Sequence, residues 1–151
     1  MQKQLLFAII LMISIRSFSQ PENDRINYWK VTAHKTSNWD FALEKQGSWT
    51  NWISNQSDPN PIVIAINTDR GTIGISNKGG VLLSLLSEEK NTEEVIEGKK
   101  CLCYYYKAID RTGMAGEKCD VILRAFYDDT LHLVVSYNSI KIAYLASRIR
   151  D

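Results

Sequence analysis

The chain has 151 residues, of which 44% are hydrophobic and 23% are charged. This balance is typical of one globular domain and excludes a disordered, collagen-like or coiled-coil protein. The 18 Lys and Arg residues against 17 Asp and Glu residues give a formal net charge of only +1. Nucleic acids and anionic membrane surfaces are bound by proteins with an excess of positive charge, so neither is expected as a partner.

The first 19 residues have the pattern of a secretory signal peptide. Lys3 precedes an apolar run over 5–15, and residues 17–19 have the small-x-small arrangement of a cleavage site. The run is too short for a bilayer-spanning helix, which takes about 20 residues. We therefore predict that residues 1–19 are removed and that 20–151 form one domain without a membrane span, either periplasmic or secreted. Lys3 and Arg16 leave with the signal, so the mature net charge becomes −1.

Hydrophobic residues beyond position 25 recur mostly at a spacing of two, which is the period of a half-buried β-strand. Alternate isoleucines over 62–66, turn-forming residues at 68–71 and renewed alternation over 73–75 predict a hairpin.

The C-terminal half contains four more alternating segments. They cover residues 100–110, 119–127, 131–137 and 140–144. The links are a loop with two glycines at 111–116 and turns at 128–129 and 138–139. Because short links join antiparallel neighbours, these strands are expected to form a meander.

The rest of the chain is less regular. Strands are predicted over 26–33 and 39–43, whereas 48–61 is a polar, loop-like stretch that carries two tryptophans. Residues 87–99 are rich in Glu and Lys, which favours a solvated loop or one helical turn there.

Seven to nine strands in succession would leave two exposed sheet edges, and a sheet that closes on itself has none. We therefore predict an all-β protein, an antiparallel up-and-down meander that closes into a small barrel. A two-layer antiparallel β-sandwich is the alternative, because alternation identifies strands and not the way in which they close.

Three cysteines remain after signal removal, and an oxidising compartment permits disulfides. Cys101 and Cys103 share one face of an extended strand, with Cα atoms about 6.5–7 Å apart, at the limit for a bridge. The register that aligns the apolar faces of the hairpin sets Ala108 opposite Cys119 and Cys103 opposite Arg124, which favours Cys119 as a small buried thiol. A bridge from Cys101 or Cys103 to Cys119 is the alternative, through a shifted register or a contact across the barrel.

Motifs for catalysis or metal binding are not recognisable. The cysteines lack the spacing and the further ligands of a zinc site, so neither a metal nor a cofactor is expected. His34 and His132 lie outside any nucleophile motif, and His132, between two leucines, is expected to face solvent. The acidic pairs at 88–89 and 128–129 fall in predicted turns, where they face water. An enzyme is therefore not expected, and a hydrolase is the least favoured alternative.

Aromatic residues are the remaining functional signal. Bulky rings either fill the interior of a small barrel or line a cavity for a small apolar ligand. Tyr104 and Tyr106 share one face of their strand and are candidates for such a cavity. Together with Trp49 and Trp52 they form the predicted ligand-binding residues.

Two family resemblances support this interpretation. Gly47-Ser48-Trp49 early in an exported meander, with Arg148 near the end of the last strand, resembles the Gly-x-Trp motif and late basic residue of the lipocalin and calycin barrels. That resemblance implies a ligand pocket. Trp29-Lys30-Val31, Ile73-Gly74-Ile75-Ser76 and the hairpin ending in Cys119 resemble small exported Gram-negative bacterial proteins of unknown function. Such proteins tend to have a second cysteine across the hairpin, where this chain has an alanine, and they imply an exported β fold without a known reaction.

These observations predict an exported, non-enzymatic β-barrel that binds a small apolar ligand in its mouth or an envelope protein on its surface. The alternative is a protein–protein interaction or inhibitor module with a filled core, with an exposed patch holding some of Trp39, Trp49 and Trp52.

Overall fold

The computed structural model describes residues 25–40, 42–77, 79–113 and 116–150, so the predicted signal peptide at 1–19 lies outside the described residues. These ranges contain strands and turns and no helix, which confirms the all-β class. The strands are β1 (Ile26–Asp40), β2 (Lys45–Gln46), β3 (Ile53–Ser54), β4 (Val63–Asn67), β5 (Thr72–Ile75), β6 (Val81–Ile96), β7 (Lys99–Asp110), β8 (Glu117–Phe126), β9 (Thr130–Ser136) and β10 (Ile140–Arg148).

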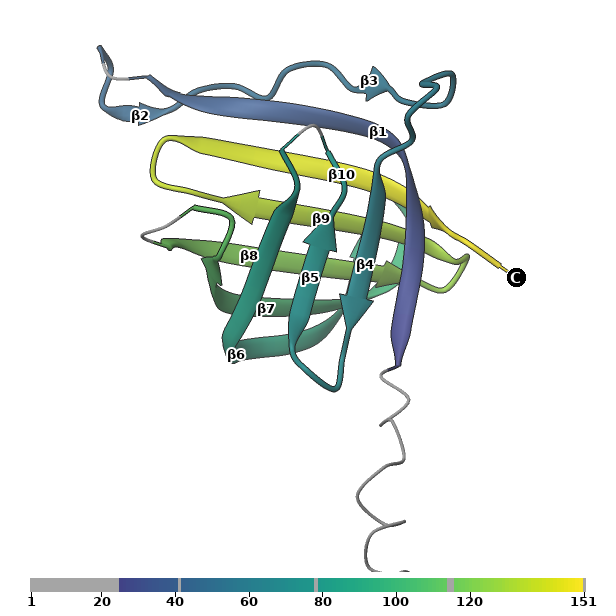
Figure 1. Cartoon of the computed structure of the whole chain (residues 1–151). Coiled ribbons are helices and arrows are strands. Elements are labelled where there is room, and N and C mark those ends of the chain that lie inside the picture. Colours follow the sequence, from purple (N-terminus) through teal and green to yellow (C-terminus); the bar gives the residue numbers. More distant parts are fainter. Residues whose placement is uncertain (1–24, 41, 78, 114–115, 151) are drawn as a thin grey trace, which may run out of the picture.

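The sheet closes on itself. Hydrogen-bonded neighbours follow in the order β10-β9-β8-β7-β6-β5-β4-β1, and β1 also pairs with β10, which completes a barrel of eight strands. The short strands β2 and β3 pair with β1 outside this ring. In Figure 1, β4, β5 and the beginning of β6 stand in front of β7 to β10 and cross them steeply. The unbroken ring of pairing confirms the predicted barrel rather than the sandwich.

Strand β1 closes the barrel because it is long enough to have two partners. Residues 26–30 pair with β4 and residues 29–38 with β10, with a shift in register at Thr32 that marks a β-bulge. The two strands predicted over 26–33 and 39–43 are thus one strand that ends at Asp40. The second prediction is wrong beyond that point because the Asp40 carboxylate accepts hydrogen bonds from the next backbone N–H groups and forms a turn.

The two predicted hairpins are confirmed, and so is the register that was predicted for the second of them. In β4 and β5, Ile64 lies opposite Ile75, and the turn at 68–71 joins the two strands. In β7 and β8, Ala108 lies opposite Cys119, as the alignment of apolar faces predicts.

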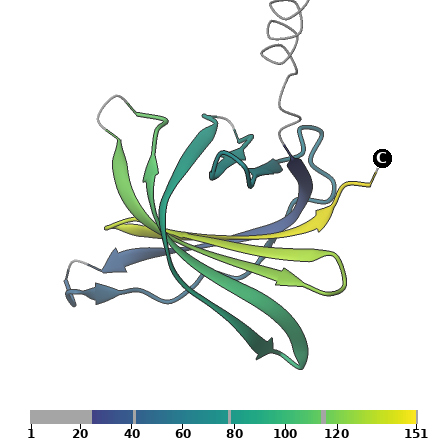
Figure 2. The same cartoon turned by 90° about the horizontal axis from the view of Figure 1, so that it is seen from below.

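The loop or helical turn predicted at 87–99 is wrong. Strand β6 continues to Ile96 and pairs with β7 along its whole second half, and the turn at Glu97 and Gly98 has φ angles of 50° and 78°. Two left-handed residues in succession are typical of the tight turn of a β-hairpin. The Glu- and Lys-rich composition is misleading because these residues lie on a strand that is exposed to solvent. Their charge indicates contact with water and not the absence of a strand. Figure 2 shows this hairpin reaching away from the rest of the barrel.

Side chains that point inward fill the barrel. All eight barrel strands contribute to one buried cluster, which contains Val31, Ile64, Ile66, Ile73, Ile75, Leu83, Ala108, Cys119, Val121, Leu131, Leu133, Val135, Tyr144 and Ala146. A cavity of about 250 Å³ is present at the end near the β4–β5 turn, where Gly71, Leu85 and Tyr106 are among its lining residues. The middle of the barrel is therefore a packed hydrophobic core, which is the main source of stability for such a fold.

Leu82 and Leu83 provide a matched test of which face forms the core. Leu83 is fully buried, whereas its neighbour Leu82 is 48% exposed on the other face of β6. We expect Leu83→Ala to lower the free energy of unfolding by about 2–5 kcal/mol and Leu82→Ala by less than about 1 kcal/mol, because only the first substitution leaves a cavity. Urea unfolding measures both, and equal losses would contradict the assignment of faces.

Candidate ligand-binding site

The structure does not bring the four aromatic residues of the predicted site together. Trp49 and Trp52 lie outside the barrel between β2 and β3, with 40% and 42% of their surface exposed. Tyr104 and Tyr106 lie on β7 and stack, with ring centroids 6.4 Å apart. Tyr106 packs against the barrel core and lines the cavity at the barrel end. Trp52 lines a different concave surface, which no prediction located.

That surface is a groove of about 440 Å³ on the outer face of the sheet, which we term the outer groove. Its apolar walls are Trp52, Ile96, Phe126 and Leu145, and its polar lining includes Lys35, Thr130, His132 and Ser147. These residues come from β1, the segment before β3, and strands β6, β8, β9 and β10. The volume and the largely apolar walls lie in the range of small-molecule sites, about 300–1000 Å³.

A row of cross-strand neighbours runs across the outer face of the sheet, and two of its members, His132 and Leu145, line the outer groove. Arg124 of β8 lies opposite Cys103 of β7 on one side and opposite His132 of β9 on the other. His132 in turn lies opposite Leu145 of β10. Directly opposed residues point to the same side of a sheet. The row belongs to the outer face, because the residues on either side of His132 in β9 are part of the barrel core.

The segment at 47–56 covers one side of the groove and is tied to β1. The Asn55 N–H donates to the Thr32 carbonyl oxygen at 2.8 Å, and the Asn55 side chain is itself buried. This anchor holds the Trp52 ring beside His132, with centroids 5.7 Å apart and ring planes tilted by 58°. A tryptophan on a loop thus covers an imidazole on the sheet.

Lys35 reaches over both loop tryptophans. Its Nζ atom lies 4.4 Å from the centroid of Trp52 and 5.2 Å from that of Trp49. Both distances are in the range of cation–π attraction, so the ammonium group is held at the edge of the groove.

His132 is neutral and half-buried, so the expectation that it faces solvent is wrong. Burial of the ring, and then the positive charges of Arg124 and Lys35, lower the pKa of His132 to about 4. The Arg124 guanidinium lies 3.2 Å from His132 Nδ1. Since a guanidinium can only donate, Nδ1 accepts, and the proton of the neutral ring sits on Nε2. His132 Nε2 and Arg124 Nε are buried and have no hydrogen-bond partner among the described residues.

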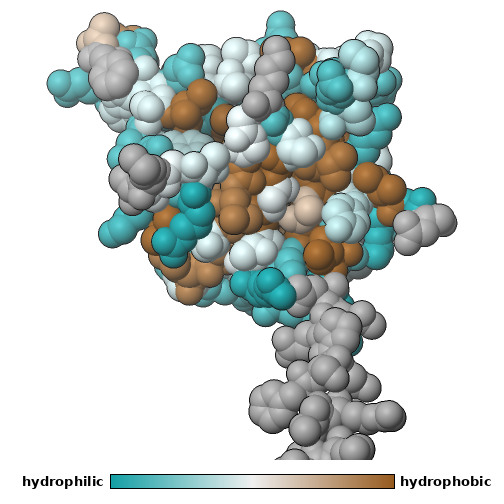
Figure 3. Space-filling model, viewed as in Figure 1, coloured by the Kyte–Doolittle hydropathy of each residue, from teal (hydrophilic) through white to brown (hydrophobic). Residues whose placement is uncertain are grey.

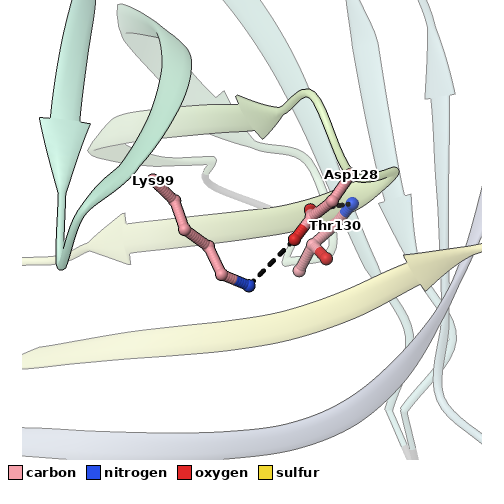
Figure 4. A network of polar contacts seen from close by, with 3 residues as sticks. All are labelled: Lys99, Asp128 and Thr130. Carbon is pink, nitrogen blue, oxygen red and sulfur yellow. Dashed lines mark hydrogen bonds and ion pairs between the residues drawn. The ribbon is translucent and has the colours of Figure 1, made fainter.

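The tips of two hairpins meet at one end of the groove. Lys99, just after the β6–β7 turn, forms an ion pair of 2.8 Å with Asp128 in the β8–β9 turn, and the Thr130 N–H donates to the same carboxylate (Figure 4). These contacts, led by the hydrogen bond from Lys99, lower the pKa of Asp128 to about 2. The ion pair fixes the separation of the hairpin tips on which Ile96 and Phe126 are placed.

The three cysteines are free and buried. Cys101 and Cys103 lie on the outer face of β7 with sulfur atoms 3.5 Å apart, while Cys119 lies in the barrel core. Burial is the largest cause that raises the pKa of Cys103 to about 12 and that of Cys119 to about 11. Because the thiolate is the reactive form, we expect Cys103 and Cys119 to react slowly in the folded protein.

The groove provides apolar walls, hydrogen-bond donors and positive charge. His34 and His132 each hydrogen-bond a side chain that is neither an acid nor a nucleophile, namely Asn55 and Arg124. Within the ranges that the structure describes, His, Cys, Asp and Glu form no cluster of three that could hold a metal ion. This chemistry suits the recognition of a ligand by shape and charge.

Sequence reasoning missed most of the groove. Ile96 lies in the segment predicted to be a loop or one helical turn, and no alternation of apolar and polar residues over 88–96 indicates a strand there. Arg124 and His132 each alternate with apolar residues in their own strands, which predicts that both lie on the outer face. Their juxtaposition depends on the register across the β8–β9 turn, which the alternation alone does not determine.

Acidification tests the environment of His132. An unperturbed imidazole has a pKa near 6.5, so below that pH the unfolded chain takes up a proton that the folded chain refuses until about pH 4. The contribution of His132 to the free energy of unfolding is therefore fully present above pH 6.5 and is lost as the pH falls from 6.5 towards 4. Between pH 7 and pH 5 the loss is about 2 kcal/mol. Urea unfolding at the two pH values measures this loss. His132→Gln keeps an acceptor for Arg124 but does not titrate, and an equal loss in that variant would contradict the assignment.

Thiol titration tests the burial of the cysteines. Folded protein at pH 8 should react with Ellman's reagent at less than one thiol per chain over several minutes, because burial disfavours the thiolate. After denaturation in guanidinium without reductant, all three thiols should react. Fewer than three would indicate a disulfide, and rapid reaction of the folded protein would contradict the burial.

Comparison with protein-family models, with curated proteins and with solved structures finds no match to this chain. The resemblance to lipocalin barrels through Gly47-Ser48-Trp49 gains no support, since Trp49 lies outside the barrel and Arg148 lies opposite Trp29 instead. Among the described residues, no helix is long and apolar enough to cross a membrane.

Proposed function

We propose that the protein is an exported, non-enzymatic binding protein that holds a small, largely apolar molecule in the outer groove. The observation that carries the proposal is a groove of about 440 Å³ whose walls include two aromatic rings from separate parts of the fold, Trp52 and Phe126. Aromatic walls with a few polar groups are the usual composition of small-molecule sites.

The packing of the barrel supports the choice of the outer groove over the barrel interior. Inward-pointing side chains such as Ile64, Leu83 and Leu133 are fully buried, and the cavity at the barrel end measures only about 250 Å³. A ligand in the centre of the barrel would have to displace this core, which costs the stability that the core provides.

Another apolar surface competes for hydrophobic molecules. Tyr28, Ala65, Gly74 and Leu82 form a cross-strand row on the outside of β1, β4, β5 and β6, and apolar side chains are visible on this side of the molecule in Figure 3. This surface is the more open of the two, and Tyr28 and Leu82 are each 48% exposed there. The protein partner predicted from the sequence concerns a different surface, one that holds some of Trp39, Trp49 and Trp52, and it stays a prediction.

Titration with the neutral fluorescent probe N-phenyl-1-naphthylamine tests the proposed function. We expect micromolar binding by the wild-type protein, and a loss of affinity of about tenfold in Trp52→Ala, because the variant lacks one wall of the groove. Trp49→Ala is a matched control, since Trp49 is equally exposed on the same segment and does not line the groove. It should bind the probe within twofold of wild type.

Leu82→Ala controls for binding at the competing apolar surface and should also leave the affinity within twofold. Absence of probe binding by the wild-type protein would overturn the proposed function. Equal losses in Trp49→Ala and Trp52→Ala, or a loss in Leu82→Ala alone, would overturn the assignment to the outer groove.

A further inference from the structure

Two buried hydrogen-bond donors at or beside the outer groove, on the lining residue His132 and on its neighbour Arg124, have no acceptor among the described residues. Nε2 of His132 bears the ring proton, because Nδ1 accepts from Arg124, and this N–H has no partner among the described residues. Nε of Arg124 is likewise buried and unpartnered. Nearly all buried polar atoms of folded proteins are satisfied, so an unpartnered N–H beside a ligand groove is a position at which a bound molecule can supply the acceptor.

Positive charge gathers at the same end of the groove. Lys35 lines the groove over Trp52. Arg124 is not a lining residue, but its guanidinium lies 3.2 Å from Nδ1 of the lining residue His132. Both charges act on the His132 ring, whose pKa they lower together with burial. Arg124 has the Glu94 carboxylate within electrostatic range, so its charge is partly compensated within the chain. A neutral carbonyl group would satisfy the His132 N–H but would leave Lys35 without a counter-charge.

The other charges of the groove lie at its far end. Lys99 is paired with Asp128, so its charge is already compensated. Glu97 is the acidic residue of the lining and sits in the β6–β7 turn. The groove therefore has a positive end, where Lys35 and the nearby Arg124 lie close to the neutral His132, and an apolar remainder between Ile96 and Phe126.

We infer that the ligand of the outer groove is an amphipathic anion, with an apolar body against Trp52 and Phe126 and one carboxylate or sulfonate group that accepts from His132 Nε2–H. This inference rests on the proposed function and adds the charge of the ligand to it. Lys35 supplies the counter-charge, and Arg124 holds the imidazole in the tautomer that donates. A low-dielectric groove strengthens such a contact relative to one in water.

A pair of probes with one aromatic skeleton isolates the anionic group. 8-Anilinonaphthalene-1-sulfonate has the body of N-phenyl-1-naphthylamine and adds a sulfonate. At pH 7.5 and a fixed ionic strength of about 0.15 M, we expect the anionic probe to bind the wild-type protein at least tenfold more tightly than the neutral one. Equal affinities would overturn the inference.

Single substitutions test which side chains cause the preference for the anionic probe. Lys35→Met and His132→Leu should each lower the affinity for the anionic probe about tenfold. They should change the affinity for the neutral probe less than threefold. His132→Gln keeps an N–H donor and should recover most of the anionic affinity. Lys141→Met removes one positive charge from the outer face of β10 outside the groove and should change neither affinity.

The outcomes separate this inference from the proposed function. No binding of the neutral probe would overturn the proposed function itself. Binding of both probes with equal affinity, and with dependence on Trp52, would leave the proposed function standing and overturn only the anionic group. Equal losses for both probes in Lys35→Met would show that Lys35 shapes the groove without recognising charge, which also overturns the inference.

Discussion

Strand β1 hydrogen-bonds to β4 along its first residues and to β10 along most of its length, and this double pairing closes the sheet. Closure removes both edges of the meander and forces the alternate side chains of every strand into one interior. The bulge at Thr32 lets one strand serve both partners. The same strand anchors the segment at 47–56, because Asn55 hydrogen-bonds to Thr32. The barrel and the cover of the outer groove therefore depend on one strand.

A strand has two faces, and the two faces of this sheet have different roles. In β9, Leu131 and Leu133 point into the core, and His132 between them points to the outer groove. The core needs apolar side chains of fitting size, whereas the outer face is free to carry Arg, His and Cys. A barrel that is filled in this way has no room for a ligand at its centre, which is why the proposed binding site lies on the outer face.

The class of fold and the register of β7 with β8 were predictable, because period-two alternation records which residues are buried. Ala108 opposite Cys119 follows from that rule alone. The groove was not predictable, because it needs the register between β8 and β9. A two-residue loop at 128–129 would set Arg124 opposite Leu133, but Asp129 has a φ of 61° and the hairpin has an extra loop residue, so Arg124 faces His132. A local sequence pattern also does not predict contacts between residues that are far apart in the chain, such as Trp52 and His132.

The long hairpin also leaves strand β6 with one partner over its second half. Strand β5 pairs with β6 only from Val81 to Ser84, and beyond that point β7 is the hydrogen-bonded neighbour of β6 among the described residues. Its free backbone groups are a template on which an extended segment of another chain could add, as in aggregation. Glu88, Glu89, Lys90 and Glu93 lie along this stretch and are exposed. The charged residues that resemble a loop in the sequence thus oppose the addition of another strand, because that strand would have to remove water from a row of carboxylates.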